Sequence, residues 1–217
     1  MQTSESFGLS ALLSFSGGLQ DAYTYNVRGG VFANAQTGNV VLMSQSFMLG
    51  NRYTALRYMF PLIAFALGIF IAERIENKFK NSTRLHWRQI ILLLEMIALT
   101  VVGALPAELN MAANVLVSFS CAMQVQTFRT VKGYGYASTM CIGNLRSGTA
   151  SFSQYLRTRD RDALSKALHF FGIILFFSIG AGTGGVLSMH LGAVTIWISV
   201  VLLLAVAIMM IQKYAKE

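Results

Sequence analysis

GGVFANAQTGNVVLMSQSFMLG, residues 29–50, is a run of 22 residues without a charge. The run is apolar enough for a bilayer, but its middle carries Asn34, Gln36, Thr37, Gly38 and Asn39. Ordinary membrane-spanning helices avoid such a cluster, because each unpaired polar group in hydrocarbon costs several kcal/mol. We therefore predict a re-entrant or broken-helix element whose polar groups line a cavity, and these five residues are candidates for binding a substrate or an ion.

The composition of the whole chain is that of a membrane protein. Of its 217 residues, 54% are hydrophobic and 12% are charged, whereas soluble domains average about 25% charged residues. The net charge of +8 comes from short basic clusters between apolar runs. The positive-inside rule explains such clusters better than nucleic-acid binding does. The two cysteines show no metal-ligand spacing, so we expect two buried free thiols and neither a metal nor a cofactor.

Six apolar runs are long enough to be transmembrane helices, which predicts an all-α polytopic membrane protein. The first run has no Lys or Arg before Arg28, so we expect a retained helix and not a signal peptide. Short connectors are expected at residues 51–57 and in the turn at Pro106, and a basic loop at residues 74–88. The six runs are residues 7–27, 58–75, 89–105, 109–128, 167–189 and 191–211.

The second half of the sequence repeats the first. Nine identities over 38 positions relate the halves at an offset of 104 and then 105 residues, and they include Gln20 with Gln124, Gly38 with Gly143, and Asn39 with Asn144. Each half also reads as a span, a polar and apolar stretch, a charged connector and two further spans. We therefore predict two repeat halves, residues 1–105 and 106–217, which is a common plan for transporters.

The distribution of Lys and Arg favours six spans. If the 29–50 stretch and its copy do not cross the membrane, one face holds fourteen of these residues and the opposite face three. If both cross, each face holds eight and no orientation signal remains. Six spans place three in each half, so the halves are inverted, and the positive-inside rule puts both termini in the cytoplasm.

Two motifs carry a resemblance to a known family. The triplet Gln20-Asp21-Ala22 and the run Gly29 to Val41, with its Thr-Gly-Asn core, are similar to the signature of the YoaK-like family. That family consists of bacterial membrane proteins of about this length, catalogued as a domain of unknown function. The resemblance implies a bacterial inner-membrane protein with about six spans and no established substrate. The second-half triplet reads Ile142-Gly143-Asn144, so the copy lacks the hydroxyl.

Two carboxylates lie inside predicted spans, where such residues usually face a bundle interior or a polar pathway. Asp21 is a candidate coupling site, and the alternative is that it reaches interfacial water or Arg28. Glu95 is a candidate proton relay, and the alternative is that it extends toward the basic surface around Arg88. Both alternatives remain open at the sequence level.

The repeated polar residues are the other site candidates. Thr37-Gly38-Asn39 and Gly143-Asn144 are predicted to face each other near the midplane, although small residues also serve close helix crossing. Gln20 and Gln124 either belong to this site or form interhelical hydrogen bonds. Arg146 either binds an anion or marks the cytoplasmic mouth.

These features favour a small inverted-repeat transporter or channel for an unidentified solute or ion, and not an enzyme. A protein that translocates or modifies lipid phosphates is the alternative, followed by a membrane scaffold. The expected partners are the lipid bilayer and the small solute or ion, without nucleic acid, and the sequence leaves room for a homo-oligomer.

Overall fold

The computed structural model describes residues 6–80, 86–131 and 134–214, and it is almost entirely helical, as predicted. The only strands among these residues form a two-residue antiparallel hairpin after α5. The elements are α1 (Phe7–Val27), α2 (Gln36–Met48), α3 (Arg52–Phe79), α4 (Trp87–Ala104), η2 (Ala107–Leu109), α5 (Asn110–Thr127), β1 (Thr130–Val131), β2 (Tyr134–Gly135), α6 (Cys141–Thr158), α7 (Arg161–Leu191), η3 (Gly192–Ile196) and α8 (Trp197–Tyr214).

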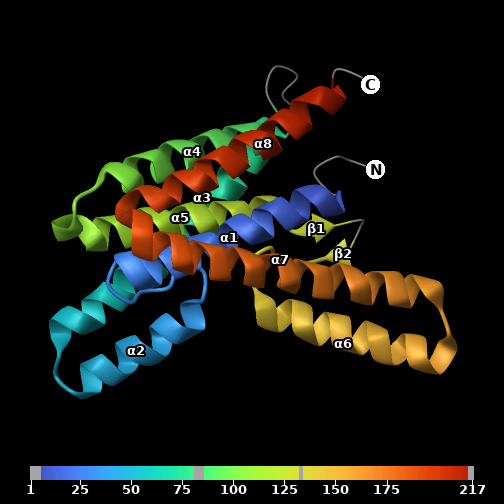
Figure 1. The fold of residues 1–217 in the computed structure, drawn as a ribbon, viewed down its shortest axis with the longest axis horizontal. Coiled ribbons are helices and arrows are strands. Elements are labelled where there is room, and N and C mark those ends of the chain that lie inside the picture. The colour runs from blue at the N-terminus through green and yellow to red at the C-terminus, as the bar shows by residue number, and fades with distance from the viewer. Residues whose placement is uncertain (1–5, 81–85, 132–133, 215–217) are drawn as a thin grey trace.

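The long helices form an elongated bundle in which helices far apart in the sequence lie side by side (Figure 1). Its two most extensive packing contacts join α1 to α7 and α3 to α5, and α4 packs against α8. The short helices cover the bundle in the same way, α2 on α3 and α6 on α7. In Figure 1, α1 begins and α8 ends at the same end of the bundle.

Three described stretches are long and apolar enough to cross a membrane: Arg52–Phe79, Trp87–Ala104 and Arg161–Ile211. The third runs through α7 and most of α8, so four of the six predicted spans overlap these stretches. The other two, α1 and α5, are not among these stretches, and most of their residues are buried against other helices. A helix that faces protein tolerates polar side chains that a helix facing lipid does not.

Glycines set the closest helix crossings. A Cβ atom on Gly180 of α7 would lie 2.7 Å from the carbonyl carbon of Phe15 in α1, and one on Gly184 would lie 2.7 Å from the Cα atom of Leu19. The sequence Gly180-Ala-Gly-Thr-Gly184 is therefore a helix-packing motif, in which small residues allow two backbones to approach.

Several predicted boundaries are wrong in detail. The expected connector at residues 51–57 is mostly helix, because the Asn51 side chain caps α3 by accepting a hydrogen bond from the Thr54 backbone N–H (3.2 Å). Pro61 therefore lies in the interior of α3. The expected basic loop begins inside α3, which continues to Phe79, and residues 81–85 of that loop lie outside the described ranges.

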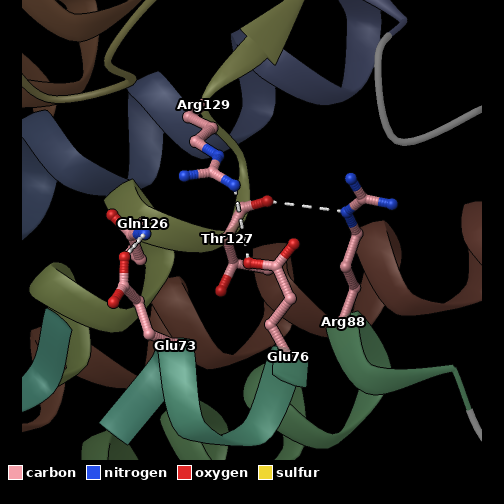
Figure 2. A network of polar contacts seen from close by, with 6 residues as sticks. All are labelled: Glu73, Glu76, Arg88, Gln126, Thr127 and Arg129. Carbon is pink, nitrogen blue, oxygen red and sulfur yellow. Dashed lines mark hydrogen bonds and ion pairs between the residues drawn. The ribbon is translucent and has the colours of Figure 1, made fainter. Parts of the chain in front are cut away.

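A polar network joins the end of α5 to α3 and α4 (Figure 2). Gln126 donates a hydrogen bond to Glu73 of α3 (3.0 Å), and Arg129 forms an ion pair of 3.6 Å with Glu76. The Arg88 guanidinium at the start of α4 donates to the Thr127 carbonyl (3.5 Å). These contacts tie three helices together near the C-terminal end of α3.

Candidate functional site

The chain breaks its helical path between α1 and α2. Gly29 and Gly30 have φ angles of +86° and +78°, a conformation that residues with a Cβ resist. A hydrogen bond holds the break against α1: the Asp21 carboxylate accepts from the Asn34 backbone N–H (2.7 Å). The Asn34 side-chain amide in turn donates to the Gly17 carbonyl (3.3 Å). Asp21 therefore lies where the break approaches α1.

Asn39 holds the break in shape from the first turn of α2. Its fully buried amide donates to the Phe32 carbonyl (2.7 Å) and to Gln36 Oε1 (2.9 Å), and it accepts from the Phe32 N–H (3.2 Å). All of these contacts are with its own loop and helix. The geometry thus assigns Asn39 a positioning role for Phe32.

A second break lies between α5 and α6 and contains the β hairpin. Asn144 of α6 donates to the Ala137 carbonyl (2.7 Å), seven residues earlier, as Asn39 does to Phe32. Gln124 of α5 donates to the Leu13 carbonyl of α1 (3.3 Å) and to the Ser138 hydroxyl (3.1 Å). These contacts bring the second break against α1.

Both breaks open onto one cavity of about 880 Å³. The helices α2 and α6 begin at this cavity and run from it toward opposite ends of the bundle (Figure 1). Its wall is completed by α1, α3 and α7. The lining residues are Asp21, Ala22, Tyr25, Asn26, Phe32, Asn34, Ala35, Gln36, Thr37, Leu62, Phe65, Ala66, Ile69, Thr139, Met140, Cys141, Ile142, Gly143, Phe177, Ala181 and Gly185.

Five of the twelve predicted site residues line the cavity, and seven lie elsewhere. The five are Asp21, Asn34, Gln36, Thr37 and Gly143. Those outside the lining are Gln20, Gly38, Asn39, Glu95, Gln124, Asn144 and Arg146.

The predicted glycine breaks are displaced from their expected positions. Gly38 and Gly143 are helical residues of α2 and α6, and neither has a positive φ angle. The conformational freedom of glycine is used earlier, at Gly29 and Gly30. Gly38 lies beside the Phe32 ring, and Gly143 borders the cavity.

The remaining predicted residues have structural contacts or exposed positions. Gln20 accepts from the Cys121 thiol of α5 (2.8 Å), which is the interhelical hydrogen bond that the sequence left open. Glu95 is fully buried in α4, so it does not extend toward the basic surface, and neither carboxylate oxygen has a hydrogen-bond partner among the described residues. Arg146 is exposed on α6.

The predicted alternative of an Asp21 contact with Arg28 is wrong. Arg28 is 1% exposed, and its guanidinium donates to the Tyr23 hydroxyl (2.8 Å), to the Val102 carbonyl (2.8 Å) and to Asn110 Oδ1 (3.1 Å). Arg28 therefore joins the end of α1 to α4 and α5. It does not pair with Asp21, which lines the cavity.

Several lining residues gave no signal in the sequence. Tyr25, Phe32, Phe65 and Phe177 are aromatic residues in apolar segments, which usually mark core packing. Cys141, expected to be buried, is half-buried and lines the cavity. Within the described ranges, His, Cys, Asp and Glu do not gather into a group that could hold a metal ion.

Comparisons with known proteins agree with a membrane protein. Residues 9–209 match a family described as "Protein of unknown function (DUF1275)". The chain is also similar to the UPF0700 transmembrane protein YoaK of Bacillus subtilis (strain 168), with 27% identity over 214 residues that cover 91% of each chain. No solved structure matches the chain.

Proposed function

Because the chain belongs to the DUF1275 family and is a membrane protein, we propose that it is a small inverted-repeat transporter or channel. Its solute or ion would bind in the cavity between the starts of α2 and α6. The observation that carries this proposal is that both helical breaks, far apart in the sequence, line one cavity beside the Asp21 carboxylate. Inverted-repeat transporters place their substrates at such meeting points of discontinuous helices.

The lining of the cavity supports the duplication. Residues Asn34 to Thr37 all line it, and so do the residues 105 positions later, Thr139 to Ile142. The offset is the one that relates the two halves of the sequence. Both halves would thus contribute the same segment, the residues that lead into the short helix, to one site between the halves.

Two further pairs of contacts repeat between the halves. The Asn39 and Asn144 amides each donate to the carbonyl seven residues earlier, both at 2.7 Å. A Cβ on Gly68 of α3 would lie 2.5 Å from the Phe119 carbonyl oxygen, and a Cβ on Gly180 of α7 would likewise meet the carbonyl of Phe15. Phe15 and Phe119 are partners in the repeat.

The course of the helices supports inversion and re-entrant short helices. With the bundle axis taken as the membrane normal, α2 and α6 start near the middle and run toward opposite faces (Figure 1). The end at which α1 begins and α8 ends would be cytoplasmic, because fourteen of the seventeen Lys and Arg residues would lie on that side. The protein would then be a multi-pass protein of the bacterial inner membrane.

The native thiol of Cys141 offers a direct test of a pathway through the membrane. In a Cys121→Ser background, a membrane-impermeant methanethiosulfonate is applied to right-side-out and to inside-out vesicles. A transporter or channel exposes a residue of its central cavity to both faces, so Cys141 is expected to react from each side, at different rates. Reaction from one face only, under all conditions, would contradict a transport function.

The same vesicles test the inversion. Met48→Cys at the end of α2 and Arg157→Cys at the end of α6 replace exposed residues. In a background without native cysteines, position 48 should react from the outer face and position 157 from the cytoplasmic face. Reaction of both positions from one face would show that α2 and α6 are not inverted.

A further inference from the structure

We infer that the cavity selects an apolar organic cation and holds its ammonium group at Asp21, an inference that rests on the proposed function. Asp21 is the only charged side chain among the described residues that line the cavity. Asp21 is 7% exposed, and the described residues offer its carboxylate no ion pair. A buried carboxylate without a counterion is costly, and a cationic ligand would supply the missing charge.

Beside Asp21, two lining residues each carry a buried, uncharged oxygen atom without a hydrogen-bond partner among the described residues. They are Asn34 Oδ1 and Thr139 Oγ1, in residues that are 5% and 6% exposed. Both residues adjoin Gly17, since Asn34 donates to its carbonyl and a Cβ atom there would run into the Thr139 side chain. Gly17 lies one helical turn before Asp21, so the three oxygen-bearing residues gather on one side of α1.

The chemistry of these groups favours a ligand that donates hydrogen bonds. A carboxylate and an amide oxygen only accept hydrogen bonds, and a hydroxyl can also accept. An ammonium group carries a positive charge and up to three N–H donors, so it complements the Asp21 carboxylate, the charged group of the described lining. A carboxylate or phosphate ligand would instead bring acceptors against Asp21 and Asn34.

The rest of the wall fits an apolar body attached to that cation. Tyr25 and Phe32 stack with their ring centroids 4.8 Å apart, and Phe65 and Phe177 face the cavity from α3 and α7. Aromatic faces attract cations and pack against apolar groups. A volume of about 880 Å³ lies within the range of pockets for small organic molecules, whereas an inorganic ion needs far less space.

The starts of α2 and α6 at the cavity do not reverse this preference. A helix N-terminus carries a partial positive charge that favours anions. At α2 the Asp21 carboxylate already accepts the Asn34 backbone N–H, so the protein itself supplies the anion there. The remaining terminus, at α6, carries only a partial charge.

The test measures protection of Cys141 in the purified full-length protein, with the Cys121→Ser substitution. The rate of N-ethylmaleimide modification is followed with three probes of similar shape: 2-phenylethylammonium, 3-phenylpropionate and 2-phenylethanol. The ammonium probe at about ten times its Kd should slow modification about tenfold, because occupancy excludes the reagent. At the same concentration, the anionic and neutral probes should leave the rate unchanged.

Substitutions separate the contribution of the charge from that of shape. Asp21→Asn keeps an acceptor for the Asn34 N–H and should abolish protection by the ammonium probe. Glu76→Gln removes a carboxylate outside the cavity and should leave protection as in the parent protein.

Protection by the carboxylate or the alcohol equal to that by the ammonium would overturn the inference, as would full protection in Asp21→Asn. The comparison of probes needs only the parent protein, so it stands even if a variant fails to fold. If Cys141 reacts from both membrane faces but no ammonium probe protects it, the cation inference fails and the proposed function remains. If Cys141 reacts from one face only, the proposed function itself fails.

Discussion

Gly180 and Gly182 of α7 allow the α1–α7 crossing to be tested by two nearly identical substitutions. A Cβ atom on Gly180 would overlap the Phe15 carbonyl and lie 2.8 Å from the Phe15 Cα atom, whereas a Cβ on Gly182 would meet nothing within 4 Å. Gly180→Ala should therefore destabilise the protein, and Gly182→Ala should stabilise it. The two variants add the same methyl group to the same helix, two residues apart.

The magnitude follows from the distances. Non-bonded carbon atoms rest about 3.5–4.0 Å apart, so α1 and α7 must separate by roughly 1 Å to admit the Gly180 methyl group. Such overpacking typically costs about 1–3 kcal/mol. Alanine gains about 1 kcal/mol over glycine in a helix. The free energy of unfolding should thus fall by up to about 2 kcal/mol for Gly180→Ala and rise by up to about 1 kcal/mol for Gly182→Ala.

Thermal unfolding of both variants in the same detergent measures the two signs against the parent protein. Gly184→Ala provides a second contact variant, because its Cβ atom would lie 2.7 Å from the Leu19 Cα atom. If Gly180→Ala raised the unfolding midpoint as much as Gly182→Ala, the close approach of α1 and α7 would be refuted.

Three further outcomes are expected in the same unfolding assay. Asn39→Ala should lower the midpoint, because it removes the two hydrogen bonds to the partly buried Phe32 backbone, each worth about 0.5–1.5 kcal/mol; an unchanged midpoint would contradict a positioning role for Asn39. Glu95→Met should raise the midpoint, because it removes two buried oxygens without partners among the described residues; a large loss would mean that the carboxyl group has a partner. Arg129→Ala should change stability by less than about 1 kcal/mol, since its ion pair with Glu76 spans 3.6 Å and Arg129 is 57% exposed.

The long helices were predictable because hydrophobic runs and helix signals agree along most of the chain. The predicted run 109–128 lies within one residue of α5 at each end. Boundaries failed where a side chain overrides hydropathy, as where Asn51 caps α3 and carries the helix into an apparently polar connector. Hydropathy measures the preference for lipid, and it carries no information about a cap.

The cavity was only partly predictable, because its wall is assembled by tertiary packing. The polar cluster at residues 34–39 indicated one side of it, and the repeat indicated the other side near Gly143. The sequence could not separate lining residues from supporting ones: Thr37 borders the cavity, while Asn39, two residues later, turns its amide into its own loop. Thr139 could have been found as the counterpart of Asn34 at the offset of 105.

The two proposed halves differ at the position of Asp21. The counterpart of Asp21 in the second half is Val125 or Gln126, and Gln126 binds Glu73 in the network that joins α5 to α3 (Figure 2). The cavity borders the C-terminal part of α1 and the middle of α3, and no residue of α5 lines it among those described. The first half thus contributes the charge of the site. At the corresponding position, the second half contacts α3 near its C-terminal end.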